Sequence, residues 1–107
     1  MDVTLRIVGQ REGRRLNKTF RKMNRPTNVL SFSHGTQGDI VLCHPVIARE
    51  ARTQAKSLRA HYAHLVVHGV LHLRGYTHEK KHDADRMERA EIRILRRLGL
   101  RNPYAVE

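Results

Sequence analysis

The sequence has only one cysteine, Cys43, which excludes an internal disulfide bond. It has no tryptophan, two phenylalanines and three tyrosines, so a hydrophobic core must be built from Leu, Val, Ile and Ala. No apolar run approaches the roughly 20 residues that span a bilayer, and residues 1–6 lack the basic and apolar regions of a secretory signal. These absences favour a cytoplasmic protein without a membrane segment, in which Cys43 is a small buried apolar group.

The charge of the chain is strongly one-sided. Lysine and arginine number 21 against 10 aspartate and glutamate residues, which gives a net charge of +11 over 107 residues. A field of this sign attracts polyanions, and we expect the partner to be nucleic acid rather than an anionic membrane surface. The alternative is a solvated surface that only keeps the protein in solution. A chain of this length is expected to form one domain over residues 1–107.

The pattern of apolar residues predicts an α+β fold, with a small sheet packed against helices. The expected strands are 3–8, 28–32 and 39–43, and the last of these should be central because it is nearly all apolar. The expected helices are 14–22, 45–73 with a break near Ser57, and 83–98, with a turn at 9–13 and a loop at 33–38. Ser57 can cap a new helix after the break. The predicted inner face of the last helix consists of Met87, Ala90, Ile94, Leu95 and Leu98.

Three histidines near the end of the 45–73 segment form the strongest local pattern. His68 and His72 are four residues apart and so share one helix face, with Cβ atoms roughly 6 Å apart. Gly75 allows the chain to turn back, so that His78 can supply a third ligand. Three neutral imidazoles leave a fourth tetrahedral position for water, which is the layout of a catalytic zinc site. Ordinary helical histidines would not need a glycine at this bend, so we predict one metal ion. Availability and geometry favour Zn²⁺.

The spacing His-x-x-x-His-x-x-Gly-x-x-His is also that of the metzincin proteases, with one departure. Those enzymes carry a glutamate as general base directly after the first histidine, where this chain has Gly69. A peptidase that uses this mechanism is therefore disfavoured. A site that includes His64, four residues before His68, is geometrically possible but lacks a bend and a third ligand. Surface or capping roles are expected for His64, His61 and the other three histidines.

Three blocks of sequence together resemble the bacterial YbeY family of endoribonucleases. They are Phe20–Arg21 with Pro26–Phe32, then Gly38–Cys43, and then His61–His78. The resemblance extends from about Val3 to Tyr104, and the run His-Gly-x-Leu-His-Leu-x-Gly-Tyr is highly specific. The chain departs from the family pattern at Thr77, where the family has aspartate, and at Ser33-His34, which replaces a Pro-led stretch. Typical members also carry an additional N-terminal segment, so we expect one flank of the sheet to be bare.

The resemblance implies a metalloprotease-like α+β fold in which His68, His72 and His78 hold one zinc ion on a central helix and its following turn. It implies a zinc-dependent endoribonuclease that acts on single-stranded RNA. Its implied roles are small-subunit ribosomal RNA maturation and ribosome quality control in the cytoplasm, with RNA and ribosomal particles as partners. Arg21 matches the family's arginine ahead of the Pro-Thr-Asn block and is implied to take part in activity. The oligomeric state is left open.

These residues suggest a mechanism in which the metal assists attack on a phosphate by water or by an RNA 2′-hydroxyl. Arg21 would bind that phosphate and stabilise the developing charge, unless it is only a surface charge at a helix end. Backbone phosphates are expected to contact two basic clusters. The first comprises Arg11, Arg14, Arg15, Lys18, Lys22 and Arg25, and the second comprises Arg93, Arg96, Arg97 and Arg101. Two other functions stay open: a metal hydrolase of another substrate such as a peptide, and a non-catalytic zinc-containing ribosome-binding factor.

Overall fold

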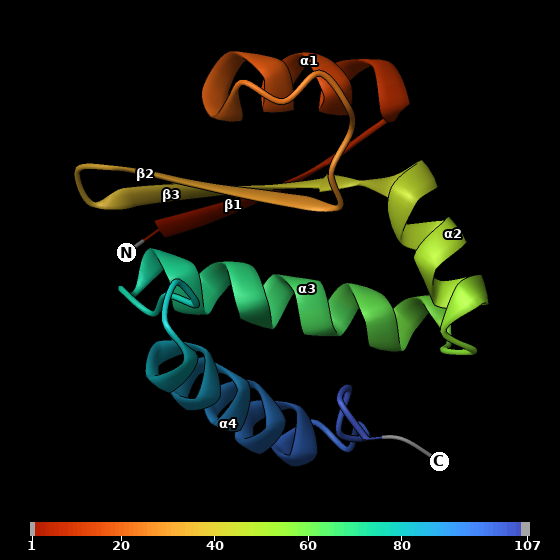
Figure 1. Ribbon diagram of the computed structural model, residues 1–107, viewed down its shortest axis with the longest axis vertical. Helices are drawn as coiled ribbons and strands as arrows, with labels where there is room; N and C mark the ends of the chain where they lie inside the picture. The colour runs from red at the N-terminus through yellow and green to blue at the C-terminus, as the bar shows by residue number, and fades with distance from the viewer. Residues whose placement is uncertain (1, 106–107) are drawn as a thin grey trace.

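The computed structural model describes residues 2–105, and in this range it has three strands and four helices (Figure 1). The strands are β1 (Asp2–Val8), β2 (Val29–His34) and β3 (Gln37–Cys43). The helices are α1 (Gln10–Arg21), α2 (His44–Thr53), α3 (Leu58–Leu73) and α4 (Lys81–Arg97). The predicted α+β class is confirmed. None of these helices is both long enough and apolar enough to cross a membrane.

The sheet has the strand order β1-β3-β2, with β1 parallel and β2 antiparallel to β3. The central position predicted for β3 is confirmed, because its side chains are buried on both faces of the sheet. Ile40 and Leu42 belong to the cluster that includes Leu65 of α3, whereas Val41 and Cys43 belong to the cluster beside α1. The predicted loop at 33–38 is wrong, because β2 and β3 extend to a turn of only two residues.

The elements stack in layers, with α1 on one face of the sheet, α3 on the other, and α4 beyond α3 (Figure 1). Helix α3 is therefore covered on two sides. Leu65 packs against the sheet, while Leu71 packs against Met87 and Ala90 of α4. At the sheet edge, Leu5 and Ile7 of β1 are exposed. The layered packing fixes α3 in place, and α3 carries the candidate site.

Several boundaries differ from the sequence prediction for physical reasons. Helix α1 begins at Gln10, so the predicted turn at 9–13 is wrong. Gly13 lies inside this helix, and a Cβ there would stand only 2.9 Å from Sγ of Cys43, which explains the need for glycine. Leu98 lies beyond α4 and is exposed, so its predicted inner-face position is wrong as well. The break before α3 is confirmed, since Oγ of Ser57 accepts a hydrogen bond from the backbone N–H of Ala60 at 3.1 Å.

Candidate metal centre

The end of α3 and the bend that follows it place the three predicted histidines together. His68 and His72 occupy the last two turns of the helix. Gly75 adopts a left-handed backbone conformation with φ +98°, which a glycine accommodates without strain. Its N–H bonds to the carbonyl of His72, and the N–H of Tyr76 bonds to the carbonyl of Leu71, both at 3.0 Å. This pair of bonds is a Schellman motif, and it turns the chain back so that His78 returns to the helix.

The three imidazoles converge on one region. The ring centroids are 4.6 Å apart for His68 and His72, 4.9 Å for His72 and His78, and 5.6 Å for His68 and His78. One nitrogen from each ring lies within 4.8 Å of the other two. The Nε2 atoms of His68 and His72 are only 3.1 Å apart. Within residues 2–105 this is the one group of side chains that could hold a metal ion, and it excludes His64.

In His68 and His72, hydrogen bonds made by Nδ1 leave Nε2 available to bind a metal ion. Nδ1 of His72 donates to the backbone carbonyl of Tyr76 at 3.0 Å, and Nδ1 of His68 donates to a carboxylate oxygen of Glu91. Both Nε2 atoms then keep a lone pair directed at the common region. Burial, together with the neighbouring His68 and His78, lowers the pKa of His72, which favours the neutral ring that a metal ligand requires.

Glu91 is a site residue that the sequence reasoning missed. It lies on α4 and is fully buried, and it accepts hydrogen bonds from His68 and from the hydroxyl of Tyr104. Burial alone would raise the pKa of Glu91, but hydrogen bonds with His64, His68 and Tyr104 outweigh burial and lower the pKa to about 2. Glu91 therefore stays ionised. The sequence does contain a sign of this role: Glu91 is a charged residue on the inner face of α4, four residues after Met87, where apolar residues are expected.

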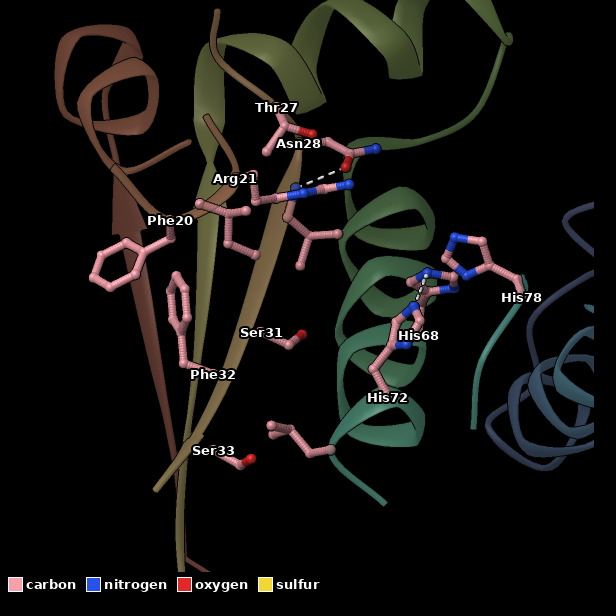
Figure 2. A pocket seen from close by; sticks show the side chains of 13 residues that line it. Phe20, Arg21, Thr27, Asn28, Ser31, Phe32, Ser33, His68, His72 and His78 are labelled. Atoms are coloured by element: carbon pink, nitrogen blue, oxygen red, sulfur yellow. Dashed lines mark hydrogen bonds between the residues drawn. The ribbon is translucent and has the colours of Figure 1, made fainter. Parts of the chain in front are cut away.

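The histidines open onto a groove of about 630 Å³ between α3 and the edge strand β2. His68 and His72 line one wall, and Ser31 and Ser33 of β2 line the other. Arg21, the last residue of α1, also lines the groove, and its side chain extends toward α3 (Figure 2). The groove therefore combines a possible metal position with a guanidinium group.

Two further histidines have structural partners, so the surface or capping roles expected for them are wrong. His61 is buried, and its Nε2 bonds to Glu50 at 3.0 Å. Glu50 also accepts a hydrogen bond from the side-chain amide of Asn28, which lines the groove, at 3.1 Å. Nε2 of His64 lies 3.2 Å from the hydroxyl of Tyr104. His61 and His64 therefore hydrogen-bond to residues near the site but are not among the three histidines that could bind the metal.

The first basic cluster predicted to contact RNA lies on α1 and in the segment after it, whereas Arg93, Arg96 and Arg97 of the second cluster lie on α4. Arg14 bonds to Asn24 at 2.9 Å, and Arg15 pairs with Glu12 at 3.5 Å. These positions are on the face of the sheet opposite α3, and the C-terminal end of α1 is the part that approaches the groove. Thr77, which stands where the family pattern has aspartate, is exposed in the bend between Tyr76 and His78.

Comparison with known proteins gives consistent matches. The family model described as Endoribonuclease YbeY matches residues 1–99. Proteins named Endoribonuclease YbeY from Aromatoleum aromaticum and Bordetella petrii are 53% and 54% identical to this chain; each alignment covers 97% of the chain and 70% and 71%, respectively, of the relative. A solution structure of a Thermotoga maritima protein is similar at 30% identity with a TM-score of 0.58, covering 91% of this chain and 70% of that one.

Proposed function

The chain belongs to the endoribonuclease YbeY family, and we propose that it cuts RNA in the groove between Arg21 and the histidine trio. One observation carries this proposal: three imidazoles converge on a wall of a groove that a guanidinium enters from another element. The proposed site residues are His68, His72 and His78 as metal ligands and Arg21 as the phosphate-binding group. The family match supports the substrate class, and the geometry supports the proposed roles.

We propose that the metal is zinc. The donor set fits, because three imidazole nitrogens lie within 4.8 Å of one another and two of the rings are oriented by hydrogen bonds through Nδ1. Zn²⁺ in such a site lowers the pKa of water and polarises a phosphoryl oxygen. His68 and His72 present their Nε2 atoms, and the exposed position of His78 keeps the site open to the groove.

The proposed role of Arg21 is to bind and orient the scissile phosphate. A guanidinium presents several donors in one plane, so it can pair with two phosphate oxygens at once. Its place at the end of α1 is fixed by the left-handed residue Lys22, whose N–H bonds to the carbonyl of Lys18 at 3.0 Å. A positive charge held beside the phosphate stabilises the negative charge that develops as the bond breaks.

We further propose that the substrate is single-stranded ribosomal RNA, presented by ribosomal particles in the cytoplasm. The support for this finer assignment is the family resemblance, together with the chain's net charge of +11. The groove has the paired rings of Phe20 and Phe32 at its edge, with centroids 4.7 Å apart. Unpaired bases can stack on such rings, whereas a base inside a duplex cannot.

The proposal is tested with zinc-loaded wild-type protein and single-stranded and structured RNA. His72→Ala is expected to lose both tight zinc binding and cleavage. Arg21→Ala should keep its zinc but cleave about 100-fold more slowly, the typical cost of losing a donor to developing charge. Arg97→Ala, at the far end of α4, is the matched arginine control and should cleave like the wild type. Equal cleavage by His72→Ala and wild type would point to a contaminating nuclease and defeat the proposal.

A further inference from the structure

Glu91 links the proposed metal centre to the C-terminal segment of the chain. One carboxylate oxygen, Oε2, accepts the hydrogen bond from Nδ1 of His68. The other, Oε1, accepts from the hydroxyl of Tyr104 and lies 3.5 Å from Nε2 of His64. Three separate parts of the chain, α3, α4 and the segment after α4, therefore meet at one buried carboxylate.

Because the Glu91 carboxylate is buried, its position is closely constrained. The Glu91 side chain is completely inaccessible to solvent, and a buried carboxylate is tolerated only when its oxygens are hydrogen-bonded. Moving the carboxylate would leave both His68 and Tyr104 without their acceptor. The packing of α4 against α3 through Met87 and Leu71 holds the helix that carries it. The position of Glu91 is thus fixed by the fold rather than by the ligand.

We propose that Glu91 is a positioning residue that holds His68 as the Nδ1–H tautomer with Nε2 directed at the metal, and that Tyr104 holds Glu91 in turn. This inference rests on the proposed metal site. It adds that metal binding depends on a residue of α4 and on the segment after that helix, neither of which contributes a ligand.

The two helical histidines differ in a way that makes the inference testable. The partner of His72 is the backbone carbonyl of Tyr76, which no side-chain substitution removes. The partner of His68 is a side chain, which can be changed alone. Glu91→Gln keeps the shape of the side chain but offers one acceptor oxygen to two donors, His68 and Tyr104. Tyr104→Phe removes one donor at the distant end of the chain of hydrogen bonds.

The experiment measures zinc affinity by competition with a chromophoric chelator, using Glu91→Gln, Tyr104→Phe and the wild type. Loss of an outer partner of a ligating histidine typically weakens metal affinity about 10–100-fold, and we expect this for Glu91→Gln. Tyr104→Phe should shift affinity in the same direction by a smaller factor. Glu88→Gln, one turn earlier on α4, is the matched control and should remain within about twofold of wild type, since it removes no partner of a ligand.

A second measurement separates positioning from a general structural role. Long-range ¹H–¹⁵N NMR spectra of the metal-free proteins report which ring nitrogen of His68 carries the proton. We expect Nδ1–H in the wild type and a detectable fraction of Nε2–H in Glu91→Gln. Wild-type protein with His68 as Nε2–H, or a folded Glu91→Gln with unchanged zinc affinity, would overturn the inference. A wild type that binds zinc but leaves RNA intact would instead defeat the proposed nuclease function and leave this inference standing.

Discussion

Gly69 shows at the scale of a single residue why this site differs from that of a metzincin. It is buried on the face of α3 that packs against the sheet, directly after His68. A Cβ at this position would lie 3.0 Å from both Cδ1 of Ile40 and Oγ of Ser31. The hydroxyl of Ser31 also donates to the Gly69 carbonyl at 3.4 Å. A side chain here fits only if Ile40 and Ser31 shift by a few tenths of an ångström, so the contact between helix and sheet favours glycine.

The packing at Gly69 leads to a prediction about stability. Gly69→Ala should lower the free energy of unfolding by about 1–3 kcal/mol, because the added methyl group forces α3 away from the sheet. Denaturant unfolding of the metal-free protein measures the change. Gly9→Ala is the matched control, since nothing lies within 4 Å of a Cβ there and its φ of −86° suits alanine. Equal stability of Gly69→Ala and wild type would show that the sheet yields to the methyl group.

At the scale of an element, the bend after α3 determines whether the third histidine can reach the other two. The left-handed conformation of Gly75 gives two results at once: it turns the chain toward His78 and it brings the carbonyl of Tyr76 to Nδ1 of His72. The bend therefore both delivers one ligand and orients another. A change in its backbone angles should weaken the metal site even though Gly75 contributes no ligand.

Gly75→Ala is accordingly expected to affect two measurable properties. Placing alanine in the left-handed region costs about 1–2 kcal/mol, so unfolding of the metal-free protein should require less denaturant. Zinc affinity should fall as well, because the strained bend relaxes and displaces His78. Gly35→Ala is the matched control, since Gly35 has a φ of +62° in the turn between β2 and β3. It should lose comparable stability and keep its zinc affinity; a parallel loss of affinity would contradict the role assigned to the bend.

The parts of this site that could be predicted from sequence are local ones. Residues four apart share a helix face, and a glycine permits a reversal, so His68, His72 and Gly75 were sufficient to predict the trio. Glu91 was missed because its partners lie 23 and 13 residues away, and only the packing of α4 on α3 brings them together. A carboxylate within an apolar helix face was the available sign.

For secondary structure too, the sequence predicts the features that depend on local patterns and misses those that depend on tertiary contacts. The long helical segment and its break were predicted because Ser57 is a strong capping residue, and the central strand because its residues are nearly all apolar. Because glycine is typical of turns, Gly13 predicts a helix that starts at residue 14, whereas α1 begins at Gln10. Glycine at this helical position avoids a clash with Cys43, which lies 30 positions further along the chain. The reason for glycine here is a tertiary contact, which the local sequence does not reveal.

At the scale of the whole molecule, the fold separates the two basic clusters. Lys18 and Lys22 lie at the C-terminal end of α1, beside Arg21, which lines the groove. Arg96 and Arg97 lie in the last turn of α4, whereas the bend with His78 precedes the first turn of that helix. None of the described residues that line the groove belongs to α4, whereas Phe20 and Arg21 of α1 do line it. RNA bound in the groove should therefore use the first cluster.

This arrangement predicts how RNA affinity depends on salt. Affinity for a single-stranded oligonucleotide should fall steeply between about 50 and 200 mM salt, because each neutralised phosphate releases condensed counterions. In the metal-free protein, where the RNA is not cut, fluorescence anisotropy gives the slope of log affinity against log salt. Lys18→Gln/Lys22→Gln should make that slope shallower by about 1.4, since each contact to a single strand contributes about 0.7. Arg96→Gln/Arg97→Gln removes the same charge from the far end of α4 and should leave the slope nearly unchanged. A larger change in this second pair would place the RNA path along α4 instead of across the end of α1.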